Sequence, residues 1–471
     1  MSKTIIIIGA GLAGLSAALQ AAENGCNVKL VSSLPSERAQ SVMAEGGINA
    51  ALNTKDENDS PEEHFTDTIK AACGLADPNA VWGMTQAAPE LVHWLLKLGV
   101  KFNMSGYDDV DLRNFGGQKK KRTAFAQSDT GKQIMTAMID AVRRKEASGM
   151  VERFSHHSFL TLRLCGNICC GCVIRDEYSQ ETVELPGDAV IVATGGMHGL
   201  FGNTTGSLSN TGEVTAELFR LGVPLANGEM IQYHPTTVKC GGKRMLISEA
   251  ARGEGGRLFA MKDGKQWYFM EEKYPELGNL MPRDITAREI WKVSHESEVF
   301  LDMTEISEEI ISNKLSGLAD DCMTYLHKDI RKEPVSVLPG IHYFMGGILV
   351  DEQHRTPIQN LYAAGECCAQ YHGANRLGGN SLLGALYGGR VAAKSACEQA
   401  DVVDLSCATQ IDFPPASQIS EIKQLNKVMQ ETMGVVRNEN TLLNGIKTVQ
   451  ALTGNLPLLG MAVLKSALAR K

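Results

Sequence analysis

The stretch Thr4 to Gly14, TIIIIGAGLAG, decides how we expect this chain to fold. Residues 4–8 form an apolar run typical of a buried β-strand, and the glycines after it have the GxGxxG spacing. The alanine-rich segment LSAALQAAENG then predicts a helix that ends at a glycine. A strand, a glycine turn and a helix in this order place a pyrophosphate at the helix N-terminus. The expected cofactor contacts here are Gly9, Gly11, Leu12, Ala13 and Gly14.

Three further segments fit the same ligand. The next predicted strand, CNVKLVS, ends at Ser32, where an acid usually binds the adenosine ribose, but a serine can also hydrogen-bond a hydroxyl. Residues 41–52, SVMAEGGINAAL, fit a loop close to a planar ligand, although an ordinary Gly-Gly turn is an alternative. The strand-like run 188–196, DAVIVATGG, returns the chain to the sheet. The expected contacts are Ser32, Ser41, Ala44, Gly46, Gly47, Ala193, Thr194 and Gly195.

Residues 365–383, GECCAQYHGANRLGGNSLL, follow the strand-like run IQNLYAAG. The glycines of this stretch allow the backbone to approach a bulky ligand, and Arg376 offers a planar fork of donors suited to a carboxylate. The small polar residues before LLGALYGGRVAA predict a helix start with free N–H groups. We interpret the stretch as a site for a flavin and an anionic substrate. The expected cofactor contacts are Gly365, Glu366, Asn380, Ser381 and Leu382.

Length and composition bound the possibilities. A chain of 471 residues with 43% hydrophobic residues can form two or three globular domains. The net charge of 46 − 54 = −8 makes nucleic acid an unlikely partner, and we expect most of the basic run QKKKR (118–122) to be solvated, although Lys120 or Arg122 could contact a phosphate or the substrate. Neither a signal peptide nor an apolar run of about 18 residues is present, which predicts a cytoplasmic protein without a membrane span.

Twelve cysteines in a chain of this length fit reduced thiols better than a disulfide framework. The cluster Cys165, Cys169, Cys170 and Cys172 could suggest a metal or iron–sulfur site. However, LCGNICCGCVIRDE alternates like a strand followed by a turn. We therefore predict a buried β-strand and no metal site.

The order of these segments predicts an α/β protein with a Rossmann-like FAD-binding domain that is discontinuous in sequence, covering 1–229 and 346–405. Residues 230–345 carry their own strand-like and helical runs, and we expect them to form an inserted α+β capping domain. Residues 416–471 read as the start of a C-terminal helical domain, and LKSALARK ends within a helical pattern without a stop signal, so we expect this domain to be incomplete.

The capping segment carries the candidate chemistry: YHPT (233–236), SEAARGEGG (248–256), PRD (282–284) and HYFMGG (342–347). Each motif alone has an ordinary explanation, such as a capped turn, a salt bridge, a helix start or a buried histidine. Taken together, two histidines and the arginines at 252, 283 and 376 beside a predicted flavin require an anionic ligand, since a buried group of cations is costly without one.

These motifs, with MAEGG, RNFGG, RTAFA and DTG, lie in the order seen in one family. The chain resembles the flavoprotein subunits of fumarate reductase and succinate dehydrogenase and, more broadly, the family that includes L-aspartate oxidase. The resemblance implies that His234, Ser248, His342 and Arg376 bind a small dicarboxylate. It also implies that hydride passes from FAD N5 to one olefinic carbon while Arg283 protonates the other, with protons supplied through a relay from Glu249 to Arg252 to Arg283.

Covalent family members attach FAD to a histidine, and the resemblance puts Gln40 at that position. Glutamine cannot form the linkage, so we predict noncovalent FAD and, with it, fumarate reduction as the working direction. No haem or iron–sulfur motif and no second dinucleotide fingerprint is present, so electrons must come from elsewhere. We expect an iron–sulfur or other electron-transfer subunit, which could hold the chain at the inner face of a membrane.

Three alternatives stay open at this stage. The first is reduction of another unsaturated carboxylic acid, with the same relay and a different pocket. The second is L-aspartate oxidation, although RNFGGQKKKRTAFAQSDTG resembles the fumarate and succinate branch. The third is a non-catalytic flavin electron-transfer subunit, against which the complete relay argues.

Overall fold

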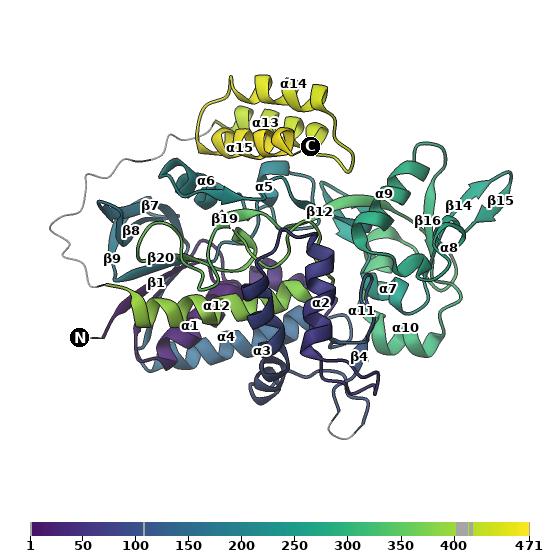
Figure 1. Cartoon of the computed structure of the whole chain (residues 1–471), viewed down its shortest axis with the longest axis horizontal. Coiled ribbons are helices and arrows are strands. Elements are labelled where there is room, and N and C mark those ends of the chain that lie inside the picture. The colour runs from purple at the N-terminus through teal and green to yellow at the C-terminus, as the bar shows by residue number, and fades with distance from the viewer. Residues whose placement is uncertain (1, 107–108, 402–412, 414–417, 471) are drawn as a thin grey trace.

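A parallel five-stranded sheet is the centre of the computed structural model, which describes residues 2–106, 109–401, 413 and 418–470 (Figure 1). The strand order is β20-β10-β1-β2-β6, and every pairing is parallel. The strands are β1 (Thr4–Ile8), β2 (Asn27–Ser32), β6 (Val151–Ser155), β10 (Ala189–Val192) and β20 (Leu361–Ala363). The sheet confirms the predicted α/β fold class, and its strands come from distant parts of the chain. We call this sheet and the helices packed on it the nucleotide-binding unit.

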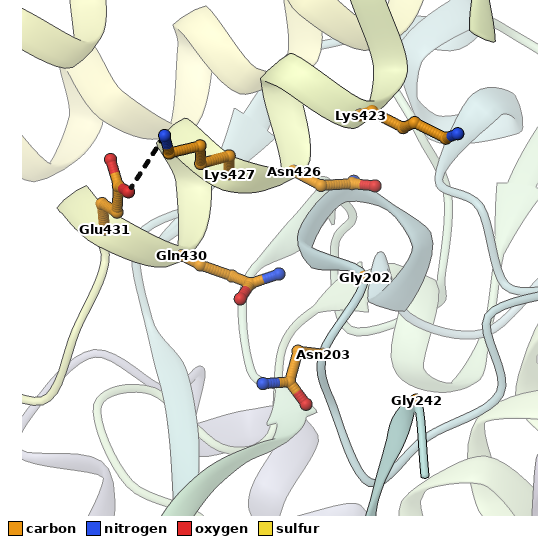
Figure 2. A pocket seen from close by; sticks show the side chains of 8 residues that line it. All are labelled: Gly202, Asn203, Gly242, Lys423, Asn426, Lys427, Gln430 and Glu431. Atoms are coloured by element: carbon orange, nitrogen blue, oxygen red, sulfur yellow. Dashed lines mark ion pairs between the residues drawn. The ribbon is translucent and has the colours of Figure 1, made fainter. Parts of the chain in front are cut away.

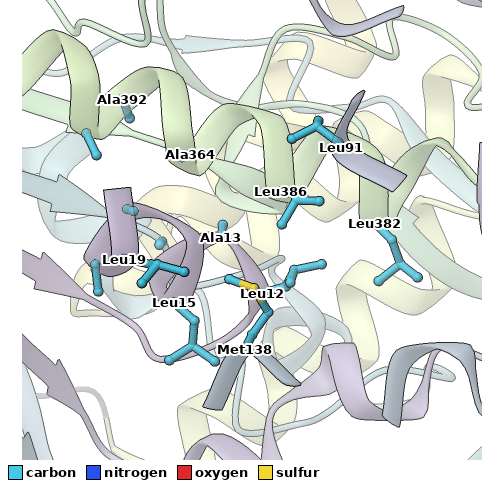
Figure 3. Packing of buried hydrophobic residues seen from close by; sticks show 14 of the residues in the cluster. Leu12, Ala13, Leu15, Leu19, Leu91, Met138, Ala364, Leu382, Leu386 and Ala392 are labelled. Atoms are coloured by element: carbon cyan, nitrogen blue, oxygen red, sulfur yellow. The ribbon is translucent and has the colours of Figure 1, made fainter. Parts of the chain in front are cut away.

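Strand β1 has a buried side chain on each face of the sheet, as its continuous apolar run predicts. Ile5 and Ile7 pack in a core with the helices α1 (Leu12–Glu23), α4 (Thr130–Ala147) and α12 (Asn380–Gln399), part of which is drawn in Figure 3. Ile6 and Ile8 pack against the antiparallel meander β7 (His157–Cys165), β8 (Ile168–Asp176) and β9 (Thr182–Pro186). The sheet is therefore covered on both faces.

The cysteine-rich segment forms strand β8 of this meander. Cys169 and Cys172 lie in the core under the sheet, so the prediction of a buried strand is confirmed. Within the part of the chain that the structure describes, no group of three or more His, Cys, Asp or Glu side chains could hold a metal ion. The same part contains no helix that is long and apolar enough to cross a membrane.

Residues 231–344 contain two further sheets; in Figure 1, β14, β15 and β16 of one sheet lie at the right, and β12 of the other lies nearer the middle. One has the order β13-β12-β18 and the other β15-β14-β16-β17. The strands are β12 (Ile231–Cys240), β13 (Lys243–Leu246), β14 (Arg257–Lys262), β15 (Lys265–Trp267), β16 (Val299–Asp302), β17 (Val335–Ser336) and β18 (Leu338–Phe344). The helices are α7 (Glu249–Gly253), α8 (Phe269–Lys273), α9 (Arg283–Val293), α10 (Glu308–Lys314) and α11 (Ser316–Asp321). We call these residues the cap.

Three C-terminal helices, α13 (Ile419–Thr432), α14 (Glu439–Val449) and α15 (Asn455–Ala469), lie over α5 (His198–Phe201) and α6 (Glu213–Arg220) in Figure 1. Leu425, Met429 and Leu459 of these helices share a buried cluster with Leu200 and Phe344. The exact limits of the three expected domains stay predictions, and the limits at 405 and 416 lie outside the described residues.

The remaining elements include two long helices, α2 (Pro61–Ala72) and α3 (Pro78–Lys97), and the short strands β3 (Ile48–Asn49), β4 (Leu112–Arg113), β5 (Thr123–Ala124), β11 (Leu225–Ala226), β19 (Gly347–Leu349) and β21 (Cys368–Ala369). Arg122 does not lie in a solvated loop and is not free for a phosphate or substrate. Its guanidinium is fully buried and binds Asp59 and Asp67, with N–O distances of 2.8 and 2.9 Å. Its charge is therefore used to hold the loop before β5 against α2.

Candidate active site

A cavity of about 950 Å³ lies between the nucleotide-binding unit and the cap, and both contribute to its wall. The nucleotide-binding unit supplies mostly small residues, which we call the glycine wall: Gly9, Gly11, Gly46, Gly47, Gly195 and Gly365. Polar and charged side chains from the cap and from the loop before α12 form what we call the charged wall: His234, Glu249, Arg283, His342 and Arg376.

The glycine wall leaves the N-terminus of α1 open to the cavity. Gly9 has a φ of +112°, and a Cβ there would lie 2.3 Å from the carbonyl oxygen of Ala193. Gly11 is different, because a Cβ there would meet nothing closer than 3.8 Å. The packing of the protein itself thus does not require glycine at position 11. A ligand that approaches the free N–H groups of α1 would require it, as a pyrophosphate does.

Two side chains beside this helix end also fit a dinucleotide. The Ser32 hydroxyl lines the cavity and is buried, yet it has no hydrogen-bond partner among the described residues. A buried hydroxyl without a partner is costly, and a ribose hydroxyl would supply one. The Ser41 hydroxyl accepts a hydrogen bond from the Leu12 N–H at 3.3 Å, which holds the 40–47 loop against α1. The residues present therefore fit FAD.

The charged wall is organised around the side-chain oxygen of Gln232. This oxygen accepts a hydrogen bond from Arg283 Nη1 at 3.0 Å and another from Arg376 Nη2 at 2.9 Å. Arg376 also lies over the ring of Tyr343, with 4.2 Å between its guanidinium carbon and the ring centroid. Its Nε is buried and has no partner within the described chain. Two guanidinium groups thus converge on one side of the cavity with donor capacity to spare.

Glu249 is the only carboxylate that pairs with these buried arginines among the described residues. Its Oε2 accepts from Arg283 Nε at 2.8 Å, and its Oε1 lies 3.3 Å from Arg252 Nη2 and accepts the Gly116 N–H at 3.0 Å. Burial alone would raise the pKa of this carboxyl, but the two arginines outweigh it, and the pKa lies below its ordinary value. Glu249 is therefore ionised at neutral pH.

The two histidines of the charged wall are neutral. Burial and the nearby Arg283 hold the pKa of both His234 and His342 well below the ordinary histidine value. Their rings are 5.1 Å apart between centroids. His342 Nδ1 pairs with the Thr205 hydroxyl at 2.8 Å, and His234 Nδ1 lies 3.1 Å from the Thr236 carbonyl oxygen. Because these contacts use Nδ1 of each ring, Nε2 is left for a ligand.

Comparisons with known proteins identify the family of this chain. The FAD binding domain family matches residues 4–382. The succinate dehydrogenase flavoprotein subunit of Bacillus subtilis is 44% identical over 413 residues, which cover 86% of this chain and 70% of that protein. This chain belongs to the succinate dehydrogenase and fumarate reductase flavoprotein family. It is therefore an FAD-dependent oxidoreductase.

Two further relatives and one solved structure are similar to most of this chain. The 8-methylmenaquinol:fumarate reductase flavoprotein subunit of Wolinella succinogenes is 32% identical, with 94% of this chain and 76% of that one covered. The L-aspartate oxidase of Streptomyces coelicolor is also 32% identical, with 96% and 80% covered. The structure of FrdA from E. coli quinol fumarate reductase has a TM-score of 0.87 at 26% identity and covers 99% of this chain and 87% of that one.

Most of the residues expected at the site line the cavity of this flavoprotein. On the nucleotide side these are Gly9, Gly11, Leu12, Ala13, Ser32, Ser41, Ala44, Gly46, Gly47, Ala193, Thr194, Gly195, Gly365, Glu366, Ser381 and Leu382. On the cap side and in the loop before α12 they are His234, Ser248, Glu249, Arg283, His342 and Arg376. Gln40 also lines the cavity, and its side-chain oxygen accepts the Ser207 N–H at 2.6 Å.

Three expected residues are not among those that line the cavity: Gly14 and Asn380, expected at the cofactor, and Arg252, expected in the proton relay. A Cβ at Gly14 would lie 1.8 Å from the Gly9 carbonyl oxygen, so this glycine serves the packing of α1 against the turn. Asn380 is fully buried, and its side-chain oxygen pairs with His64 Nε2 at 2.9 Å. Arg252 contacts Glu249 and donates to the Asn279 carbonyl oxygen at 2.6 Å.

The contacts of the expected relay also run in a different order. Glu249 lies between the two arginines, with one carboxylate oxygen toward Arg252 and the other toward Arg283. The sequence comparison had placed Arg252 in the middle. Because the carboxylate bridges the pair, Arg283 contacts Glu249 directly and not through Arg252.

Sequence reasoning missed three groups of this site. Gln232 could have been found, because it lies two residues before His234 and a β-strand directs alternate residues to the same side. The Gly116 N–H, which binds Glu249, could not be assigned from a loop sequence. Glu45 lines the cavity, and its Oε2 is buried without a partner in the described chain. Burial and Asp321 raise its pKa to about 8.

Proposed function

We propose that this chain, with FAD bound, reduces fumarate to succinate or catalyses the reverse reaction. The charge of the buried site supports the proposal most directly. In the charged wall together with Arg252, the three arginines carry +3 and Glu249 carries −1, while His234 and His342 are neutral, so the net charge of these six groups is 3 − 1 = +2. A dicarboxylate with charge −2 neutralises this site, whereas a buried excess of positive charge without a ligand is costly.

Each residue then has a role in the proposed reaction. Arg376 and His342 bind one carboxylate and draw charge away from the double bond, while His234 and Ser248 bind the other. Bound FAD supplies the hydride. Arg283 donates the proton to the second carbon. Of the five N–H donors of a guanidinium, Arg283 uses three for Glu249 and Gln232 among the described residues, which leaves 5 − 3 = 2 for a ligand.

Glu249 allows Arg283 to act as the proton donor. A free guanidinium is a poor acid because its pKa exceeds about 12, so Arg283 needs a group that returns its proton at once. Glu249 accepts from Arg283 through a contact of 2.6 Å and is itself held by Arg252 and the Gly116 N–H. We assign Glu249, which is ionised at rest, as the carboxylate that takes up a proton from solvent and passes it to the neutral guanidine left at Arg283, and Arg252 as the group that holds Glu249.

The cofactor and the partner belong to the same proposal. Gln40 lines the cavity where covalent relatives are expected to have a histidine, which supports noncovalent FAD and fumarate reduction as the working direction. Acid precipitation would then release all of the flavin into solution, and flavin retained by the precipitate would contradict noncovalent binding.

The relatives are named as flavoprotein subunits, which supports an iron–sulfur partner that could hold this chain at a membrane surface.

The test is fumarate-dependent oxidation of dithionite-reduced methyl viologen by the FAD-loaded chain. We expect turnover in the wild type and a loss of roughly 10²- to 10⁴-fold in Arg283→Ala, the range for a lost proton donor. The matched control is Arg288→Ala. Arg288 lies on the same helix, with a half-exposed side chain 3.8 Å from Asp284, and its removal should leave turnover unchanged.

Two outcomes would redirect the proposal. A yellow protein that does not turn over fumarate but reduces another unsaturated acid would change the substrate and keep the residue roles. The similarity to an L-aspartate oxidase supports one further measurement, oxygen-dependent consumption of L-aspartate. Turnover in that assay without fumarate reduction would replace the proposed function.

A further inference from the structure

The two sides of strand β12 make different contacts. Gln232 binds Arg283 and Arg376, and His234 lines the cavity. Tyr233, between them, does not line the cavity. Its hydroxyl donates a hydrogen bond to the carbonyl oxygen of Met433 at 2.7 Å. Met433 directly follows α13, so the strand that carries the site is bonded from behind to the C-terminal helices.

Several other contacts join these helices to the same part of the fold. Ile231 of β12 and Phe344 of β18 share a buried cluster with Leu425, Met429 and Met433. Asn426 donates to the Gly199 carbonyl oxygen at 2.6 Å, and Gln430 donates to that of Phe201. Figure 2 shows Asn426 and Gln430 extending from α13 toward the turn that carries Gly202 and Asn203. The helices therefore pack on β12, β18 and α5 together.

The entrance to β12 is held in the same way. Glu229, two residues before the strand, is buried. Its carbonyl oxygen accepts from Arg437 Nη1 at 2.8 Å, and its carboxylate accepts from Ser466 and Arg470. Thus both the start of β12 and the residue beside Gln232 are bonded to the C-terminal segment.

The strand needs this support because its pairing with β18 is interrupted at the site. The register shifts between Gln232 and Tyr233 and again between His234 and Thr237. At such irregularities ladder hydrogen bonds are lost and the strand bends. The positions of Gln232 and His234 then depend on what lies behind the strand as well as on its neighbour.

We propose that the C-terminal helices position Gln232 and His234 for the reaction, and that the hydrogen bond from Tyr233 to Met433 is the link. Tyr233 is a positioning residue, because it contacts neither cavity nor substrate and acts through its two neighbours. The inference rests on the proposed function, since it assigns the helices a part in dicarboxylate binding. It predicts that a change behind the strand alters substrate affinity without altering the residues of the cavity.

The test compares Tyr233→Phe with Thr453→Ala in the full FAD-loaded chain. Tyr233→Phe keeps the ring and removes only the hydroxyl. Thr453 bonds Glu421 at 3.1 Å and joins the start of α13 to the segment before α15, so its removal loosens the same helices away from β12. For Tyr233→Phe we expect the KM for fumarate to rise about three- to tenfold, the equivalent of one net hydrogen bond. We expect kcat to change less than about twofold, because Arg283 keeps its pair with Glu249.

Amide hydrogen exchange of residues 231–237 gives a second readout that does not depend on turnover. Exchange there should rise in Tyr233→Phe and stay at the wild-type level in Thr453→Ala. If Tyr233→Phe loosens only α13, α14 and α15 and leaves both KM and the exchange of 231–237 unchanged, the inference is wrong. A wild-type chain that does not turn over fumarate would contradict the proposed function alone, because the exchange measurement still decides whether the helices hold β12.

Discussion

The two walls of the cavity are built by opposite means. The glycine wall works through missing side chains, which expose backbone N–H groups and the end of α1 to a ligand. The charged wall works through large side chains, with buried arginines arranged around Glu249 and Gln232. Steric room needs only the absence of a side chain at each position, whereas a group of buried charges needs compensating partners from several segments. We therefore expect the two walls to fail differently when they are changed.

The largest effect should come from Gln232→Leu, which changes the charged wall and leaves the glycine wall as it is. Arg283 and Arg376 lose their shared acceptor, and hydrogen bonds to charged groups contribute about 1.5–3 kcal/mol each. We expect kcat/KM for fumarate to fall roughly 10²- to 10⁴-fold while the flavin content stays at the wild-type level, as measured by viologen oxidation and absorbance.

Gln232→Glu is the informative control for that variant. It keeps an acceptor between the two arginines but lowers the net charge of the site from +2 to +1. Binding of a dicarboxylate should weaken, although the arginines stay in place. If Gln232→Leu lost its flavin as well as its turnover, the two walls would not be independent.

A smaller effect, on the glycine wall, is expected from Gly11→Ala. A Cβ at this position has room in the protein, so the chain should fold, but the methyl group would lie where a pyrophosphate approaches the end of α1. We expect the Kd for FAD to rise about 10- to 100-fold by fluorescence titration, which corresponds to about 1.4–2.8 kcal/mol. Gly242→Ala, where a Cβ would meet nothing within 4 Å, is the matched control and should leave the Kd unchanged.

The pH dependence of stability should report on the charged wall. Because His234 and His342 are held neutral in the folded protein, the unfolded chain binds more protons below pH of about 6.5. Their contribution is fully present above that pH and is lost as pH falls, by up to about 1.4 kcal/mol per pH unit for each histidine. Urea unfolding between pH 5 and 7 should show this slope. The double variant His234→Asn, His342→Asn should reduce it, and an unchanged slope would contradict the neutral state of both rings.

The smallest effect is expected from Ser32→Ala, on the glycine wall. The hydroxyl has no partner in the described protein, so removing it should leave the stability of the FAD-free chain unchanged or slightly higher. The Kd for FAD should rise only a few-fold, because one neutral hydrogen bond contributes about 0.5–1.5 kcal/mol. A change as large as that of Gly11→Ala would mean that Ser32 does more than bind one hydroxyl.

Much of the glycine wall could be predicted from local sequence. The turn after β1, the start of α12 and the end of β10 each combine a short apolar run with glycines, and such patterns act within a few residues. The exceptions show the limit of this reasoning. Gly14 and Asn380 stand in the expected motifs, but the side chain of Asn380 turns into the protein toward His64, and the absent side chain of Gly14 makes room for a backbone oxygen.

For this protein, the amino-acid sequence by itself determined the class of fold and FAD as the cofactor, and it named the arginines expected to bind an anionic substrate. Only the tertiary structure decided that Glu249 lies between Arg252 and Arg283, that Gln232 joins two arginines, and that Arg122 is used within the scaffold. The physical reason is range. Strand and turn patterns depend on neighbours along the chain, whereas a buried charge is defined by partners that lie tens to hundreds of residues away and meet it only when the chain has folded.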